Sequence, residues 1–522
     1  MKKILAAVLS AVLLTTTLAA CGSTAAAADE IAEEETASVQ EEETAEASSE
    51  NSPGTPPEGT PPGDPPEGFS GGTPPEKPDG NGGPGGTPPE KPDGNGGPGG
   101  TPPGGFGGSS ADIEYSAAVE ITSADSRSGE TYTSTAADES ALLIDTSEDV
   151  TVTDPAVTKT GDSDGGDSCS FYGLNAAVLV KGGGTTTFTG GTVASDANGA
   201  NGVFCYGGNG GSNGAEGDGT TLIIRDTEIV TTGDNAGGIM TTGGGVTHAY
   251  DLTVTTSGRS SAPIRTDRGG GTVTSEGGTY TSNGLGSPAI YSTADITVSG
   301  AELVSNLSEG VCIEGLNSVT LTDCDLTANN TKRNGNARFL DTVMIYQSMS
   351  GDAADGTGRF TMTGGSITSK SGHVFHVTNT SAVITLENVT IVNENPENIL
   401  LSVCADGWSG GTNSATLKAV NQLLAGAVKV GSDSSLTLEL AEGSSFTGSI
   451  DGSITDAEGN TVSTETGTVT VTLDGNSTWT LTADSYITEL SGSAENIDLN
   501  GYTLYVNGTP LTAADPQTRH IS

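Results

Sequence analysis

The chain has 522 residues and a formal net charge of −47, because 19 lysines and arginines face 66 aspartates and glutamates. Nucleic-acid binding needs basic patches, so this charge argues against a nucleic-acid partner. It also argues against direct adhesion to anionic lipid.

Residues 1–20 have the features of a signal peptide. A short basic start, "MKK", precedes the apolar run "ILAAVLSAVLLTTTLAA", which is short for a membrane span. The run ends in "LAAC", which resembles the lipobox of bacterial lipoproteins. The resemblance implies cleavage before Cys21, diacylation of Cys21 and a lipid anchor on the extracellular face of the bacterial cell membrane. A plain secretory signal followed by a chance cysteine is the alternative.

Residues 21–110 contain little that a fold could bury. Residues 22–50 carry ten acidic and no basic residues, and residues 51–110 are rich in proline and glycine. The stretch "TPPEKPDGNGGPGG" occurs at 73–86 and again at 87–100. Such a segment cannot offset the entropy lost on ordering, so a disordered stalk is expected.

Residues 111–522 consist of short runs of threonine, valine and isoleucine, separated by glycine and small polar residues. A small residue followed by an aliphatic one recurs before each pair of runs, mostly 21 to 26 positions apart. One spacing of 36 contains the glycine-rich insertion 207–219. The aliphatic residues of this repeat are Val178, Val203, Ile239, Ile264, Ile290 and Val311. The repeat is expected to continue through Met344, Val374, Leu401 and Val428, with insertions near 329–338 and 351–358.

Such a short, regular period is typical of a solenoid. Coils of about 25 residues with three short strands each resemble the right-handed parallel β-helix of pectate lyases and many bacterial surface proteins. The sequence therefore predicts an all-β, right-handed parallel β-helix with a C-terminal cap over 111–522. An array of immunoglobulin-like sandwiches is the alternative, but it requires longer strands and a longer repeat.

Five cysteines follow residue 110 with no metal-ligand spacing, so they are expected to be small buried residues with at most one or two disulfides. His373 and His376 lie three positions apart in an expected strand. That spacing places them on opposite faces, which argues against a zinc pair.

The stretch "IRTDR" offers the strongest enzyme hypothesis. The resemblance to pectate lyases implies that Arg265 or Arg268 could act as a base, with Asp267 helping to hold calcium. However, the repeat places Thr242 and Thr293 beside Asp267, and a calcium site needs six to eight oxygen ligands. The catalytic assignment therefore stays a hypothesis.

The repeat also supports a structural interpretation of the same stretch. It places Arg265 between Met240 and Tyr291 on the outward face, with a cation–π contact and an exposed ion pair to Asp267. This strip could instead contact a glycan or a protein. Between the aliphatic residue of the repeat and the glycines that follow it, this coil has one residue more than the coils at Val178 and Ile239. The extra residue is Arg268, and it predicts a bulge that turns the Arg268 side chain outward.

Other candidate sites lie in expected loops and turns. The basic residues Lys332, Arg333 and Arg338 could bind an anion or an acidic glycan. Trp408 could stack on a sugar. The stretch "GDSDGGD" resembles part of a calcium loop. Its candidate ligands are Asp162, Asp164 and Asp167.

Fold alone does not specify an activity. The favoured hypothesis is a lipid-anchored surface protein whose β-helix is a non-enzymatic adhesin or carbohydrate-binding module, with a glycan or a host or matrix protein as its partner. A polysaccharide lyase or glycoside hydrolase acting on uronate-containing glycans is the first alternative. A structural spacer of the envelope is the second.

Overall fold

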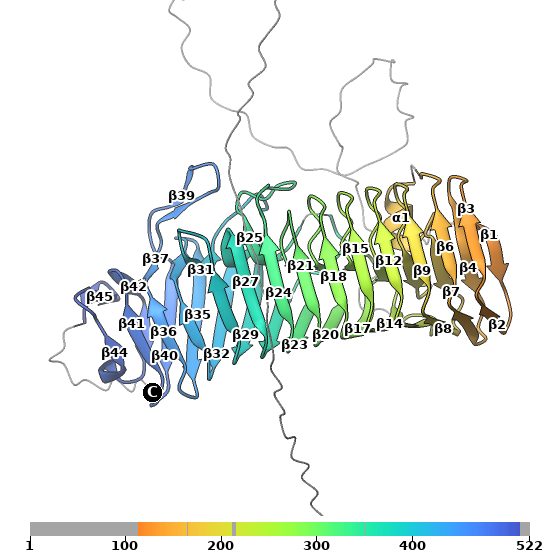
Figure 1. The fold of residues 1–522 in the computed structure, drawn as a ribbon. Coiled ribbons are helices and arrows are strands. Elements are labelled where there is room, and N and C mark those ends of the chain that lie inside the picture. The colour runs from red at the N-terminus through yellow and green to blue at the C-terminus, as the bar shows by residue number, and fades with distance from the viewer. Residues whose placement is uncertain (1–112, 164, 211–215, 349, 512–522) are drawn as a thin grey trace, which may run out of the picture. The chain divides into compact units, whose positions relative to one another are not determined.

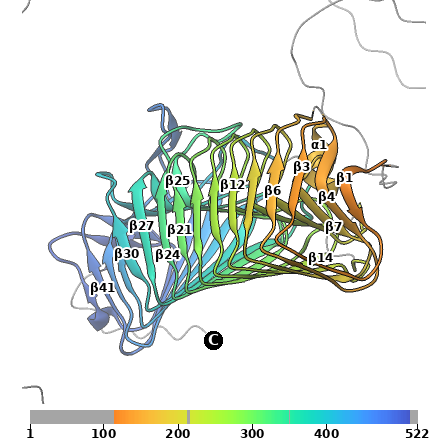
Figure 2. The same ribbon diagram turned by 45° about the vertical axis from the view of Figure 1, so that its right-hand side comes forward.

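The computed structural model describes residues 113–163, 165–210, 216–348 and 350–511, which belong to one compact unit. These residues form a parallel β-helix (Figure 1). Most coils contribute one strand to each of three long sheets, and strands of successive coils pair in parallel. Figure 2 shows the coils stacked one behind another. The predicted fold class is confirmed.

Three sheets, which we call A, B and C, form the faces of the coil. Sheet A contains β1 (Ser116–Ile121), β4 (Glu139–Asp145), β7 (Val178–Lys181), β10 (Val203–Tyr206), β13 (Ile239–Thr242), β16 (Ile264–Thr266), β19 (Ile290–Ser292), β22 (Val311–Glu314), β25 (Asp341–Tyr346), β28 (His373–Thr378), β31 (Ile399–Val403), β34 (Ala427–Val430) and β37 (Ile450–Asp451). Sheet B contains β2 (Asp125–Ser128), β5 (Val150–Thr153), β8 (Thr185–Thr189), β11 (Thr221–Arg225), β14 (Gly245–Tyr250), β17 (Gly271–Glu276), β20 (Asp295–Ser299), β23 (Ser318–Thr322), β26 (Thr357–Thr363), β29 (Thr380–Glu387), β32 (Asn413–Val420), β35 (Ser434–Ala441), β40 (Thr468–Leu473) and β43 (Glu489–Ser491).

Sheet C and the smaller elements complete the coils. Sheet C contains β3 (Thr131–Ser134), β6 (Ala156–Lys159), β9 (Thr192–Ser195), β12 (Glu228–Thr231), β15 (Thr253–Thr256), β18 (Thr279–Ser282), β21 (Glu302–Ser305), β24 (Asp325–Asn329), β27 (Ser366–Ser371) and β30 (Thr390–Asn393). A four-stranded sheet contains β33 (Leu423–Ala425), β36 (Ser445–Gly448), β41 (Thr478–Leu481) and β44 (Ile497–Asp498). The remaining elements are α1 (Asp167–Tyr172), β38 (Ile454–Thr455), β39 (Thr461–Ser463), β42 (Ser485–Ile487), the 3₁₀ helix η1 (Ala494–Asn496), β45 (Leu504–Val506) and β46 (Thr509–Pro510).

The repeat found in the sequence is the register of sheet A. The aliphatic residues from Val178 to Val311 are direct partners of one another, coil by coil. Further along, the partners are Val343 and Phe375, so the expected Met344 and Val374 are each wrong by one position. The strands β25 and β28 are buried on both faces, so apolar character does not distinguish inward from outward positions there.

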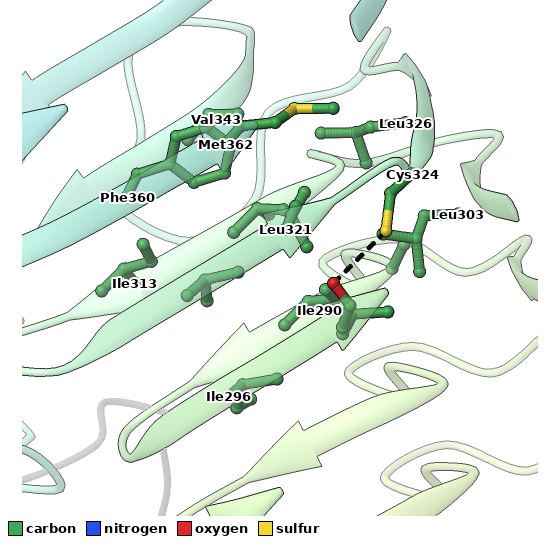
Figure 3. Packing of buried hydrophobic residues seen from close by; sticks show 14 of the residues in the cluster. Ile290, Ile296, Leu303, Ile313, Leu321, Cys324, Leu326, Val343, Phe360 and Met362 are labelled. Atoms are coloured by element: carbon green, nitrogen blue, oxygen red, sulfur yellow. Dashed lines mark hydrogen bonds between the residues drawn. The ribbon is translucent and has the colours of Figure 1, made fainter. Parts of the chain in front are cut away.

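The inward side chains form one continuous apolar core along the coil axis. Figure 3 shows a section in which Ile290, Leu303 and Leu321 from three different faces meet inside the coil. Cys324 shares this core, and its thiol donates to the carbonyl of Val298 at 3.4 Å. Full burial of such an aliphatic side chain contributes about 1.5–3 kcal/mol, so each coil is held mainly by its few inward residues.

The corner between sheets B and C explains why glycine and aspartate recur between the strands in the sequence. One residue at this corner adopts positive φ in successive coils, a conformation that glycine, asparagine and aspartate tolerate best. The corner residues are Gly129, Asp154, Gly190, Asp226, Asp251, Gly277, Gly300, Asp323, Gly364, Asn388 and Asn421. Within the described ranges, no helix has the length and apolar character to cross a membrane.

Candidate functional site

The outward face of sheet A is covered over much of its length, which the sequence did not predict. At one end, Phe171 and Tyr172 of α1 pack in an apolar cluster with Leu179, Phe204 and Met240. Met240 is therefore fully buried, and its expected role in an exposed ligand-binding strip is wrong. The cause is α1, which covers the outward apolar side chains of β7, β10 and β13.

A cleft opens where α1 stops covering sheet A. Its volume is about 240 Å³. It is lined by residues from α1 and its N-cap, from β16 and β19, from the segments that flank β16 and precede β13, and by Asp352. The lining residues are Gly166, Asp167, Ser170, Phe171, Asn235, Ser260, Arg265, Asp267, Tyr291 and Asp352. The cleft thus includes the "IRTDR" segment but joins it to residues more than 80 positions away.

Arg265 occupies the place that the repeat predicted. Its register partners are Met240 and Tyr291, and its guanidinium lies 5.9 Å from the Tyr291 ring centroid. Nη2 donates to Asp267 at 2.7 Å, and Nη1 donates to the carbonyl of Ser260 at 2.7 Å. The pairing with Asp267 is confirmed, but the expected exposure is wrong, because the two side chains are only 12% and 4% exposed.

Asp267 is a buried carboxyl group at the cleft. Burial raises the pKa of Asp267 to about 7, and the negative charge of Asp352 acts in the same direction. The charge of Arg265 and the hydrogen bond from the backbone N–H of Arg268 oppose this shift. Burial therefore favours the protonated form of this carboxyl group at pH values where an ordinary aspartate is ionised.

Arg268 lies in the turn between β16 and β17, where the coil has one residue more than its predecessor. The extra residue was expected to form a bulge, and the structure places it in the turn after the strand. Its guanidinium packs 4.2 Å from the Phe171 ring centroid and donates to Asp352 at 2.9 Å. The side chain thus joins the turn to α1 and to the 348–356 loop.

Tyr291 is held in place from the other side by a buried carboxylate. Its hydroxyl donates to Glu314 at 2.6 Å, and the Tyr346 hydroxyl donates to the same oxygen at 3.1 Å. Ser348 also donates to Glu314. Glu314, held by the hydroxyl groups of Tyr346 and Ser348, orients the Tyr291 ring at the edge of the cleft.

The charges around the cleft nearly balance. Asp167, Asp267, Asp352 and Arg265 line the cleft. Arg265 forms an ion pair with Asp267, and Arg268, beside the cleft, forms one with Asp352. Protonation of Asp267 would make the sum neutral. The two guanidinium groups are already engaged, so the cleft offers polar partners for hydroxyl groups rather than a free positive charge for an anion.

The basic insertion does not join this cleft. Arg333 pairs with Glu458, and Arg338 donates to Asp456 at 2.8 Å, so acids of the β38–β39 hairpin neutralise two of its charges. Lys332 is exposed. Trp408 packs against another aromatic residue, with its ring centroid 4.9 Å from that of Tyr346.

The calcium candidates are also separated by the structure. Asp162 accepts a hydrogen bond from the backbone of Asn198 at 2.7 Å, whereas Asp167 begins α1 and lines the cleft. Asp164 lies outside the described residues. Within the described part of the chain, no three or more histidine, cysteine, aspartate or glutamate side chains are grouped to hold a metal ion.

The two central histidines meet, contrary to the expectation that they lie on opposite faces. The Nδ1 atoms of His373 and His376 each lie 2.7 Å from the Ser402 hydroxyl, and His376 Nε2 lies 3.2 Å from Asp406. His376 is the direct partner of Ser402, and His373 reaches the same hydroxyl from the start of β28. Ser402, His376 and Asp406 thus form a connected chain of polar contacts. Ser402 is fully buried, so its hydroxyl is not exposed to solvent in this structure.

All five cysteines of the described region are buried, and within that region they are not paired in disulfides with one another. Cys21 lies outside the described residues, and its lipidation stays a prediction. Comparisons with protein-family models, curated proteins and solved structures gave no match.

The sequence identified part of this cleft and missed the rest. Arg265, Asp267 and Tyr291 were found from the repeat. Asp352 and Phe171 were not found, because an insertion and a short helix bring them in from other coils. The only available signal was that Asp352 falls in the expected insertion 351–358.

Proposed function

We propose that this chain is a surface lipoprotein whose β-helix binds glycans without cleaving them, with the sheet A cleft as a binding site for a neutral sugar residue. The observation that carries this proposal is the cleft lining. Carboxyl, guanidinium and hydroxyl groups lie beside the Tyr291 ring, and this combination can exchange hydrogen bonds with sugar hydroxyls. Since both arginines are paired with acids, the lining favours a neutral sugar over a uronate.

A glycan array probed with the full-length chain tests the proposal. Binding to neutral glycans is expected, and Asp167→Ala and Asp352→Asn should each weaken it, because both side chains line the cleft. Asp149→Ala is the matched control, since Asp149 is exposed in a turn and does not line the cleft. Binding restricted to acidic glycans, or equal binding by all four proteins, would rule out the proposed site.

A glycoside hydrolase is a second candidate, because burial raises the pKa of Asp267 to about 7 and Asp352 lines the same cleft. A protonated carboxyl group next to a second carboxylate is the pair that glycoside hydrolysis uses. New reducing ends from a bound glycan, abolished by Asp267→Asn, would support the hydrolase. Binding with no new reducing ends supports the non-enzymatic proposal.

The lipid anchor is a separate part of the proposal and rests on "LAAC" before Cys21. The substitution Cys21→Ala should move the protein from the membrane fraction to the soluble or secreted fraction, because it removes the acylated thiol. Cell fractionation followed by immunoblotting measures this. If the variant stays in the membrane fraction as the wild type does, the anchor is not at Cys21.

A further inference from the structure

A second cleft lies on the outward side of the C-terminal coils, at the blue end of the rod in Figure 1. Its volume is about 700 Å³. Its polar lining comes from β34, β37, the segment between β39 and β40, and the segments around β42 and β45. These residues include Lys429, Asp451, Glu465, Asp484, Thr488 and Asn507. None of them belongs to the cleft at Arg265.

An exposed tyrosine forms the aromatic wall of this cleft. Tyr486 is 42% exposed and lines the cleft. It is the register partner of Tyr505, and the two rings stack with centroids 5.0 Å apart and planes within 5°. This packing fixes the orientation of the Tyr486 ring, which lowers the entropy lost when a flat ligand binds against it.

The charges of this cleft are unfavourable for an anion. Lys429 donates to both oxygens of Asp451 at 2.8 Å, so its charge is compensated. Glu465 and Asp484 are exposed at the same cleft and add two negative charges. A uronate or a sulfated sugar would be repelled, whereas a neutral sugar could use the carboxylate, amide and hydroxyl groups as hydrogen-bond partners.

We infer that the Tyr486 cleft is a second saccharide-binding subsite, in which a neutral sugar ring packs on Tyr486 and its hydroxyl groups bond to Glu465, Asp484 and Asn507. This inference rests on the proposed glycan-binding function and names a separate site for it. Both clefts lie on the outward side of sheet A. Six strand steps separate β19 from β37, a distance of about 29 Å along the rod.

Titration calorimetry of the full-length chain with cellohexaose, xylohexaose and mannohexaose tests the inference. Tyr486→Ala is expected to weaken binding of at least one probe about tenfold, which corresponds to about 1.4 kcal/mol, or to reduce the number of sites. Tyr502→Ala is the matched control, because Tyr502 is equally exposed at 42% but does not line the cleft.

The Asp352→Asn variant separates this inference from the proposed cleft at Arg265. Loss of binding in Asp352→Asn and in Tyr486→Ala supports both sites. Binding that persists in Asp352→Asn and is removed by Tyr486→Ala in that background supports only the Tyr486 subsite. The Tyr486 subsite is overturned if Tyr486→Ala binds with wild-type affinity and stoichiometry. It is also overturned if Tyr486→Ala and Tyr502→Ala have equal effects. Absence of binding to all three probes by the wild type overturns both sites.

Discussion

Asp267 shows how burial and charge compete at a single residue. Its carboxyl group accepts hydrogen bonds from the guanidinium of Arg265 and the backbone N–H of Arg268, and both favour the ionised form. It is nevertheless almost inaccessible to water, and burial of a charged group is costly. Burial has the larger effect on its pKa, which places the titration near neutral pH.

This balance predicts a pH-dependent stability. An aspartate in the unfolded chain titrates near pH 3.9, whereas Asp267 in the folded chain titrates near pH 7. Between these values the folded state binds more protons than the unfolded state, so the contribution of Asp267 to stability falls as pH rises, by up to about 4 kcal/mol. Urea unfolding of the wild type and of Asp267→Asn at pH 4, 5.5 and 7.5 measures the difference between the two proteins.

The Asp267→Asn variant has no titrating group at this position, so its stability relative to the wild type should increase from pH 4 to pH 7.5. Titrating groups that do not interact with Asp267 contribute equally to both proteins and cancel in the comparison. Parallel pH profiles for the two proteins would show that burial does not raise the pKa of Asp267.

The buried histidines show a second consequence of burial. Burial lowers the pKa of His373 to about 3, and the charges of His376 and Lys429 act in the same direction. His373 is therefore neutral in the folded chain at the pH values of these experiments. Its Nδ1 can then share the Ser402 hydroxyl with His376 without placing a charge in the interior.

At the scale of the element, the positive-φ corner between sheets B and C links the sequence pattern to the register. Gly300 has φ 62°, and its N–H donates to the carbonyl of Thr322 in the next coil at 2.9 Å. The corresponding residue of the next coil is Asp323, with φ 50°. Glycine, asparagine and aspartate recur at this corner because each tolerates the left-handed conformation.

The corner conformation can be tested at Gly300, where a Cβ atom would meet no atom within 4 Å. Because an added Cβ meets no clash, Gly300→Ala should lower the free energy of unfolding by about 1–2 kcal/mol through backbone strain alone. Gly300→Asn is the control and should cost less, because asparagine adopts positive φ more readily. Equal destabilisation by both substitutions in chemical denaturation would contradict the backbone explanation.

The strands and their inward residues were predictable from the sequence, because the period of the coil determines both. Val203, Ile239 and Ile264 fill equivalent inward places in successive coils, and the sequence shows their spacing directly. The outward face of sheet A was not predictable in the same way. Insertions and α1 cover it, so outward residues such as Met240 are as apolar as inward ones.

The cleft at Arg265 depends on α1 and the insertions that cover sheet A, and not on the repeat. The repeat placed threonines beside Asp267 in the adjacent coils. The structure adds Asp352 from an insertion and Ser170 from α1, and neither position follows from the period. The sequence therefore predicts the β-helix and the register that places Arg265 between Met240 and Tyr291. The chemistry of the cleft depends on loops, and the repeat does not determine where these loops lie.

At the scale of the whole molecule, the described residues form a rod whose two clefts lie on one side. Sheet B contains 14 strands, and stacking at about 4.8 Å per strand gives a length of about 62 Å. The loops and the β38–β39 hairpin occupy the stretch between the clefts. A glycan that contacted both the Arg265 cleft and the Tyr486 cleft would have to cross these loops. If it does, the linkage of the two sites raises the overall affinity above that of either one.

The central claim is that neutral sugar binds on the outward side of sheet A. A crystal structure of the full-length chain, soaked with a neutral oligosaccharide that the glycan array selects, tests this most directly. The account predicts sugar density between Asp167 and Asp352 beside Tyr291. Sugar bound only on the outward faces of sheets B or C, or an empty cleft at saturating oligosaccharide, would contradict it.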